Sequence, residues 1–90
     1  MKTLKIKVIG KVQGVAFRYS TKLKADELGI QGTVQNLNDG SVLIYLTAPA
    51  SAVEEMEKWC HQGPKTSRVD QVLIEKLDLM QFQGFKIIRT

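Results

Sequence analysis

This chain of 90 residues contains one cysteine, one histidine and two prolines, and these scarcities exclude several kinds of protein. A single cysteine, Cys60, cannot form an intramolecular disulfide, which predicts a protein of the reducing cytoplasm. Cys60 and His61 cannot complete a zinc site, so we expect no metal. Adjacent helical residues also point about 100° apart, which argues against a Cys–His nucleophile pair. We predict instead that Cys60 packs in the core and His61 lies at the surface.

Long apolar runs and blocks of like charge are also absent. The longest apolar run, Val42 to Leu46, is far too short to cross a membrane, and Lys5 and Lys7 interrupt any apolar segment of a signal peptide. Thirteen Lys and Arg residues against nine Asp and Glu give a formal net charge of +4. The basic residues are scattered, so they predict a surface that attracts small phosphates, nucleic acid or acidic membrane, without a polybasic arm.

The length allows one domain, residues 1–90, and hydrophobic periodicity divides it into elements. We predict strands at 4–8, 30–36, 41–47, 69–76 and 85–89, and helices at 19–28 and between Ser51 and Gly63. The turn Asn38-Asp39-Gly40 is typical of a hairpin between the second and third strands.

Both helices carry recognisable end signals. Gly29 suits the left-handed position that ends the first helix. Ser51 and Glu54 match a capping box at the start of the second helix, on which Val53, Met56 and Cys60 form an apolar stripe.

This β-α-β-β-α-β order, followed by a short strand, favours an α+β protein. Two helices cannot cover both faces of so short a sheet. The economical arrangement packs both helices on one face of an antiparallel sheet, which is the ferredoxin-like α/β sandwich.

The loop from Gly10 to Arg18 has the features of a phosphate cradle. It leads from a strand into a helix N-terminus, where unpaired amides and the helix dipole attract anions. Gly14 allows close approach of the backbone to a ligand, and Arg18 adds a planar, permanently charged fork. The order of a P-loop is missing, so this is a different kind of cradle.

Two segments resemble the signatures of one family, the acylphosphatases. The run V-I-G-K-V-Q-G-V-A-F-R at 8–18 resembles their first signature, and G-T-V-Q-N-L-N-D-G-S-V at 32–42 resembles their second. Gly63-Pro64 also stands where the family usually has it. The resemblance implies that Arg18 binds the substrate and that Asn36 positions the attacking water. It places the amides that hold the phosphate in the loop formed by Gln13, Gly14, Val15, Ala16, Phe17 and Arg18.

Three residues depart from the family's pattern. Ala16 stands where glycine or phenylalanine is usual, Thr33 where an aromatic is usual, and Ala48 where glycine ends the second signature. If residue 16 needs a positive φ, alanine there costs roughly 1 kcal/mol. None of the three removes a group that does chemistry.

The resemblance implies hydrolysis of the carboxyl–phosphate bond of acyl phosphates to a carboxylate and inorganic phosphate, without metal or cofactor. The expected protein is a cytoplasmic monomer that binds neither nucleic acid nor membrane. Two alternatives are a non-catalytic phosphate- or acyl-phosphate-binding module and a nucleic-acid-binding ferredoxin-like module. Against the latter, an RNP-type run is absent, and Tyr45 is the one aromatic residue that stands out within a clear strand.

Overall fold

Five strands and two helices make up the fold of residues 1–89, the part of the chain that this computed structural model describes. Their order confirms the predicted β-α-β-β-α-β sequence with a last short strand. The elements are β1 (Lys2–Lys11), α1 (Phe17–Leu28), β2 (Gln31–Asn36), β3 (Val42–Ala48), α2 (Ala50–Gln62), β4 (Arg68–Leu77) and β5 (Phe85–Ile88).

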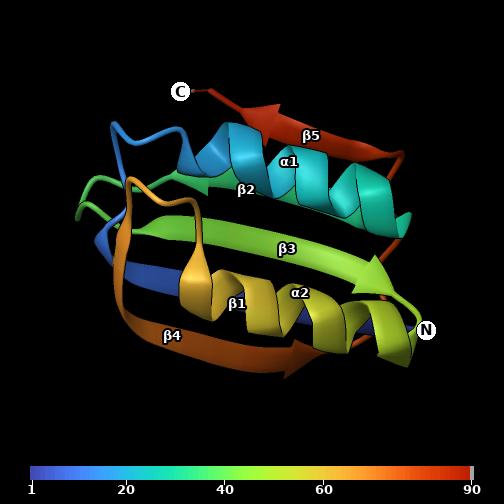
Figure 1. Ribbon diagram of the computed structural model, residues 1–90. Coiled ribbons are helices and arrows are strands. Elements are labelled where there is room, and N and C mark those ends of the chain that lie inside the picture. The colour runs from blue at the N-terminus through green and yellow to red at the C-terminus, as the bar shows by residue number, and fades with distance from the viewer. Residues whose placement is uncertain (90) are drawn as a thin grey trace.

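The strands form one sheet in the order β4-β1-β3-β2-β5, and both helices lie on the same face of it (Figure 1). β1 pairs antiparallel with β3 and β4, and β2 pairs antiparallel with β3. β5 adds a parallel pairing with β2 at the edge, so the sheet is mixed. This arrangement confirms the ferredoxin-like α/β sandwich.

Strand alternation places one row of apolar side chains across the whole sheet, facing the helices. Registered pairs link Ile74 of β4 to Ile6 of β1, Ile6 to Ile44 of β3, Ile44 to Val34 of β2, and Val34 to Ile87 of β5. Ile6, Ile44 and Val34 are fully buried. The period-2 pattern that predicted these strands therefore also builds the core.

The opposite face of the sheet carries no helix and is largely polar. The row next to the core row runs through Glu75, Lys5, Tyr45, Thr33 and Lys86. Thr33 lies on this uncovered face and is half-buried beside Tyr45. A threonine at this position therefore leaves the core packing intact. Ala48, at the end of β3, is fully buried and pairs with Lys2.

Each helix buries one face against the sheet. α1 buries Phe17, Thr21 and Ala25, while its Leu23 is 52% exposed on the far side. α2 buries the predicted stripe of Val53, Met56 and Cys60.

The C-terminus of α1 agrees with its sequence signal, whereas the N-terminus of α2 does not. Gly29 has φ 70°, and Ile30 N–H donates to Ala25 O at 2.8 Å, as expected for a left-handed C-cap. The predicted capping box at Ser51 is wrong, because α2 already begins at Ala50. Pro49, with φ −60°, is the N-cap, and its carbonyl accepts from Val53 N–H at 3.0 Å. Ser51 therefore lies inside the helix, where it cannot cap.

Three connections meet at one end of the sheet, towards the left in Figure 1. They are the β1–α1 loop at 12–16, the β2–β3 hairpin at 37–41 and the α2–β4 loop at 63–67. The fold thus brings both predicted signatures and the Gly63-Pro64 segment to the same place. Among residues 1–89, no helix is long and apolar enough to cross a membrane.

Candidate active site

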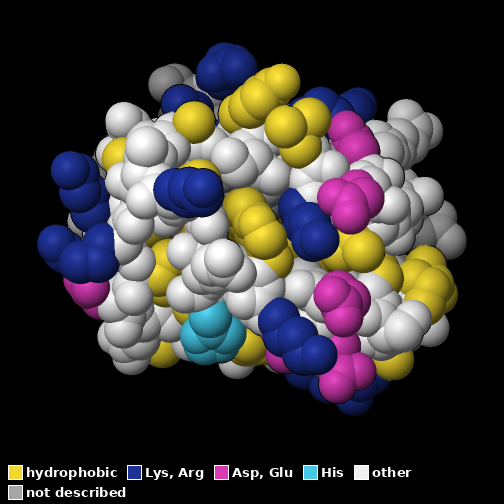
Figure 2. Space-filling model, in the orientation of Figure 1, with side chains coloured by type: hydrophobic (Ala, Val, Ile, Leu, Met, Phe, Trp, Pro, Cys, Tyr) yellow, Lys and Arg dark blue, Asp and Glu magenta, His cyan; other side chains and the backbone are white. Residues whose placement is uncertain are grey.

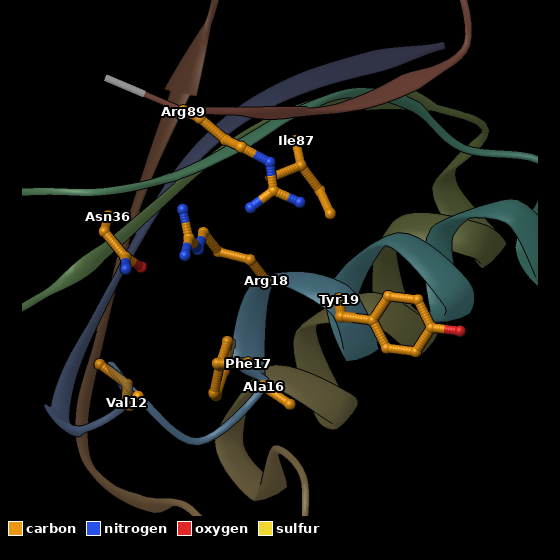
Figure 3. A pocket seen from close by; sticks show the side chains of 9 residues that line it. Val12, Ala16, Phe17, Arg18, Tyr19, Asn36, Ile87 and Arg89 are labelled. Atoms are coloured by element: carbon orange, nitrogen blue, oxygen red, sulfur yellow. The ribbon is translucent and has the colours of Figure 1, made fainter.

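The β1–α1 loop curves around a small hollow, which Figure 3 shows from close by. Gly14 has φ 73° and Ala16 has φ 61°, so the backbone turns through left-handed positions twice within three residues. Such turns point successive amides into an anion-binding concavity. The hollow has a volume of about 120 Å³, whereas pockets for drug-sized ligands measure roughly 300–1,000 Å³. Its lining residues are Val12, Gly14, Ala16, Phe17, Arg18, Tyr19, Asn36, Ile87 and Arg89.

The N-terminus of α1 opens into this loop without a capping side chain. Ala16 is the N-cap residue, and no side chain within the described residues caps the helix there. The first-turn amides of a helix have no intrahelical acceptor, and the helix dipole places partial positive charge beside them. The amides at this end of α1 are therefore free to donate hydrogen bonds to an anion.

Arg18 and Asn36 come together in this hollow from different parts of the chain. Arg18 lies in the first turn of α1 and is half-buried, with its guanidinium extending towards Asn36 at the end of β2 (Figure 3). Both residues also line a wider hollow of about 430 Å³ beside the hairpin. Within residues 1–89, none of the ion pairs involves Arg18. Its charge is thus directed at the hollow rather than at a carboxylate.

Asn36 presents a buried acceptor to the same space. Its Oδ1 is shielded from solvent and has no hydrogen-bond partner among the described residues. Buried polar atoms are nearly always paired, because leaving one unpaired costs free energy. Asn36 lines the hollow, so a small rotation of its side chain would let this unpaired oxygen accept a hydrogen bond from a molecule that enters.

The Gln13 side chain joins the loop to the hairpin. Its Nε2 donates to Leu37 O at 2.7 Å and to Ser41 O at 2.9 Å. These bonds fix the loop that precedes Arg18 against the hairpin that follows Asn36. The NH2 group of the Gln13 side chain is therefore engaged with the protein itself.

Asp39 braces the same hairpin from the other side. Its Oδ1 accepts from the amide of Ser41 at 3.0 Å and from the hydroxyl of Ser41, and its Oδ2 lies 2.8 Å from Lys7 Nζ. The hydrogen bond from Lys7, followed by those from Ser41, holds the pKa of the Asp39 carboxyl well below its usual range. The turn chemistry predicted for Asp39 is confirmed.

The α2–β4 loop supports the cradle from outside. Thr66 Oγ1 donates to Val15 O at 2.9 Å. Phe17 is 1% exposed and packs on Trp59, with ring centroids 5.4 Å apart. A Cβ added to Gly63 would lie 2.7 Å from the Phe17 ring, so glycine at this position makes room for the ring. The Gly63-Pro64 segment thus helps to hold Phe17, and with it the start of α1.

Charge around the three loops is predominantly positive. In Figure 2, most of the acidic side chains visible from the helix side lie towards the opposite, right-hand end. Asp39 and Asp70 are each paired with a cation, at 2.8 Å to Lys7 and 3.0 Å to Arg68. A hollow surrounded in this way attracts anions from solution.

Cys60 is far from being a nucleophile. The thiol is fully buried in α2, and this burial, together with the nearby Glu57 carboxylate, raises the pKa of Cys60 to about 12. A thiol with such a pKa stays protonated at neutral pH. His61 is exposed, as predicted. Within residues 1–89, no three His, Cys, Asp or Glu side chains gather as they would around a metal ion.

Sequence reasoning missed Arg89 and Ile87, which complete the hollow from β5 and the residue after it. Gln35 of β2 pairs with Ile88 in the parallel ladder, so Arg89 follows at the level of Asn36. The signal that could have found it is the apolar alternation of Phe85 and Ile87, once that strand is placed beside β2.

Fold and site together define a ferredoxin-like α+β protein in which a loop with two left-handed residues leads into an uncapped helix N-terminus beside Arg18 and Asn36. The family model described as Acylphosphatase matches residues 4–87. A protein of Rubrobacter xylanophilus named acylphosphatase is 45% identical over 83% of this chain and 68% of its own length. One of Acaryochloris marina with the same name is 41% identical over 96% of this chain and 92% of its own.

The solved structure of an acylphosphatase from Bacillus subtilis superposes with a TM-score of 0.95 at 31% identity, covering 99% of this chain and all of that one. The chain therefore belongs to the acylphosphatase family, which confirms the predicted class of enzyme.

Replacing Ala16 with glycine should stabilise the protein. An L-residue in the left-handed region costs roughly 1–2 kcal/mol, and glycine removes this strain. Glycine also makes the unfolded chain more flexible, which lowers the free energy of unfolding by about 0.4–1 kcal/mol and offsets part of the gain. We expect the free energy of unfolding to rise by about 0.5–1 kcal/mol, measured by urea denaturation at constant slope. Ser20→Gly, in the right-handed body of α1, is the matched control and should destabilise the helix. A loss of stability in Ala16→Gly would show that the turn is unstrained.

Proposed function

We propose that this protein hydrolyses the carboxyl–phosphate bond of acyl phosphates through Arg18, the amides of the β1–α1 loop and a water molecule held by Asn36. The observation that carries the proposal is the meeting of Arg18 and the unpaired Asn36 Oδ1 in one hollow at the N-terminus of α1. Membership of the acylphosphatase family supports the substrate class. We also propose that the protein acts as a cytoplasmic monomer that does not bind nucleic acid.

The leaving group explains why the site needs no acid. Cleavage of an acyl phosphate releases a carboxylate, whose conjugate acid has a pKa of about 4. Such a group departs without being protonated. Phosphoryl transfer then depends mainly on positioning and on stabilisation of charge over the phosphoryl oxygens.

The loop and Arg18 would supply that stabilisation. The amides at the start of α1 and the loop donate to phosphoryl oxygens, and the planar guanidinium of Arg18 makes paired hydrogen bonds to them. Binding at preformed donors requires little reorganisation as charge redistributes. The small size of this hollow suits a phosphoryl group.

Asn36 would orient the attacking water. Its Oδ1 accepts one water hydrogen, so that a lone pair of the water oxygen faces phosphorus for in-line attack. An amide is too weak a base to remove the proton. The proton therefore passes to a phosphoryl oxygen of the substrate as the new P–O bond forms, and the old P–O bond breaks with its electron pair on the carboxylate.

Substrate choice tests the proposal directly. We expect hydrolysis of a simple acyl phosphate such as acetyl phosphate, and no measurable hydrolysis of a phosphate monoester, because an alkoxide leaving group requires an acid that this hollow does not offer within the described residues. Release of inorganic phosphate from both compounds is measured at equal enzyme concentration. Comparable rates on the two substrates, or none on either, would contradict the proposed function.

Arg18→Lys should nearly abolish turnover. A single ammonium cannot reproduce the paired donors of a guanidinium, and we expect kcat/KM to fall by about 10³-fold. The inhibition constant of inorganic phosphate should rise as well. Arg68→Lys, an exposed arginine paired with Asp70, is the control and should stay within roughly twofold of the parent. Retention of most activity by Arg18→Lys would mean that another group holds the phosphate.

Asn36→Ala should separate binding from chemistry. Arg18 and the amides would still bind phosphate, whereas the water would lose its anchor, so kcat should fall about 100-fold. The inhibition constant of inorganic phosphate should change by less than about threefold. Gln35→Ala, one residue earlier on β2, is the control and should retain parent kinetics. Parallel losses in kcat and phosphate affinity, with altered circular dichroism, would assign Asn36 to the structure of the hairpin.

A further inference from the structure

Arg89 is a second guanidinium at the hollow, and the mechanism above gives it no role. It follows β5 directly and is exposed. Arg89 lines the hollow, and in Figure 3 its side chain lies beside Ile87 with its guanidinium towards that of Arg18. A side chain placed in this way can contact a bound substrate from outside the cradle.

Within residues 1–89, Arg18 and Arg89 face each other, and no Asp or Glu side chain pairs with either. Two guanidinium charges on one hollow repel each other in the empty site and are stabilised when an anion lies against both. An acyl phosphate brings negative charge to two places, its phosphoryl oxygens and, as it reacts, its acyl oxygen.

In-line geometry assigns Arg89 to the acyl oxygen. In in-line attack, water approaches phosphorus from one side and the leaving oxygen departs from the other. In Figure 3 the Asn36 amide and the Arg89 guanidinium lie on opposite sides of the Arg18 guanidinium. If Arg18 holds the phosphoryl oxygens and Asn36 holds the water, then Arg89 lies on the side of the leaving group.

We propose that Arg89 is a further catalytic residue, which donates hydrogen bonds to the acyl oxygen as it becomes a carboxylate. The inference rests on the function proposed above. As the water oxygen bonds to phosphorus, the bond from phosphorus to the acyl oxygen breaks and its electron pair stays on that oxygen. The water proton goes to the phosphoryl group, and Arg89 remains a cation throughout.

If Arg89 has this role, its effect on the rate depends on the leaving group of the substrate. A weaker carboxylic acid leaves as a more basic carboxylate, which gains more from a cation beside it. Removal of Arg89 should therefore harm substrates with poor leaving groups most. Contact with the phosphoryl group would instead affect all substrates alike, because that group is common to all of them.

The test uses benzoyl phosphates whose ring substituents vary the pKa of the leaving acid. For Arg89→Gln we expect kcat/KM to fall about tenfold with the weakest acid, the lower end for a charged hydrogen bond at an exposed site. The loss should shrink steadily for stronger acids, so the plot of log kcat/KM against leaving-group pKa becomes steeper. Arg89→Lys keeps the positive charge, so its slope should lie between those of the parent and Arg89→Gln. Lys86→Gln, which removes one exposed charge from β5 outside the hollow, should follow the parent line.

The inhibition constant of inorganic phosphate and the thermal midpoint complete the experiment. Both should be nearly unchanged in Arg89→Gln. An equal loss on every substrate with weaker phosphate binding would place Arg89 on the phosphoryl group and overturn the proposal. A lower thermal midpoint, with an unchanged slope of log kcat/KM against leaving-group pKa, would show that Arg89 supports the fold. This result would also overturn the proposal. If the parent hydrolyses the series and Arg89→Gln matches it, this inference alone fails, whereas a parent that hydrolyses none refutes the proposed function.

Discussion

Two hydrogen bonds from one side chain hold this site together. The loop that carries Arg18 follows β1, and Asn36 ends β2, yet β3 lies between these strands in the sheet. The Gln13 amide spans the gap by donating to Leu37 O and Ser41 O. Without it, the cradle and the hairpin would be connected only through α1 and the sheet, and the loop before Arg18 could move more freely against the hairpin after Asn36. The Thr66–Val15 bond gives the cradle a second tether on its outer side.

The cradle also depends on groups that make no contact with its hollow. Phe17 lies in the core against Trp59, and Gly63 leaves space for its ring, so the first residue of α1 is fixed by packing. Ala16 accepts a left-handed conformation immediately before it. The start of the helix, and hence the direction of its amides, follows from these two constraints. This is why a motif of small and apolar residues can form an anion site with one charged side chain.

Local patterns in the sequence predicted most of the fold. Alternating Leu4, Ile6 and Val8 identified β1, and Val53, Met56 and Cys60 identified the buried stripe of α2, because side-chain periodicity is a property of each segment alone. The capping box at Ser51 failed because Pro49 starts the helix first, and two competing local signals cannot be ranked by pattern.

What the sequence could not supply is non-local. The parallel pairing of β5 with β2 depends on which sheet edge remains open, and Arg89 reaches the hollow only through that pairing. The bonds of the Gln13 side chain likewise depend on where the hairpin lies. The loop itself pointed to Arg18, whereas Asn36 was available only because a second short motif resembled that of a family. The chemical roles of both residues remain predictions.

The composition of the hollow has a consequence for its response to acidity. Arginine stays protonated throughout the physiological range, and asparagine and backbone amides do not titrate there. The described lining contains no histidine and no carboxylic acid side chain, so protonation of these side chains does not alter the charge of the cavity between mildly acidic and neutral solution. Under the proposed function, the ionisation of the phosphoryl group of the substrate would then govern how the rate varies with pH. An enzyme organised in this way inherits its acid–base behaviour from its substrate.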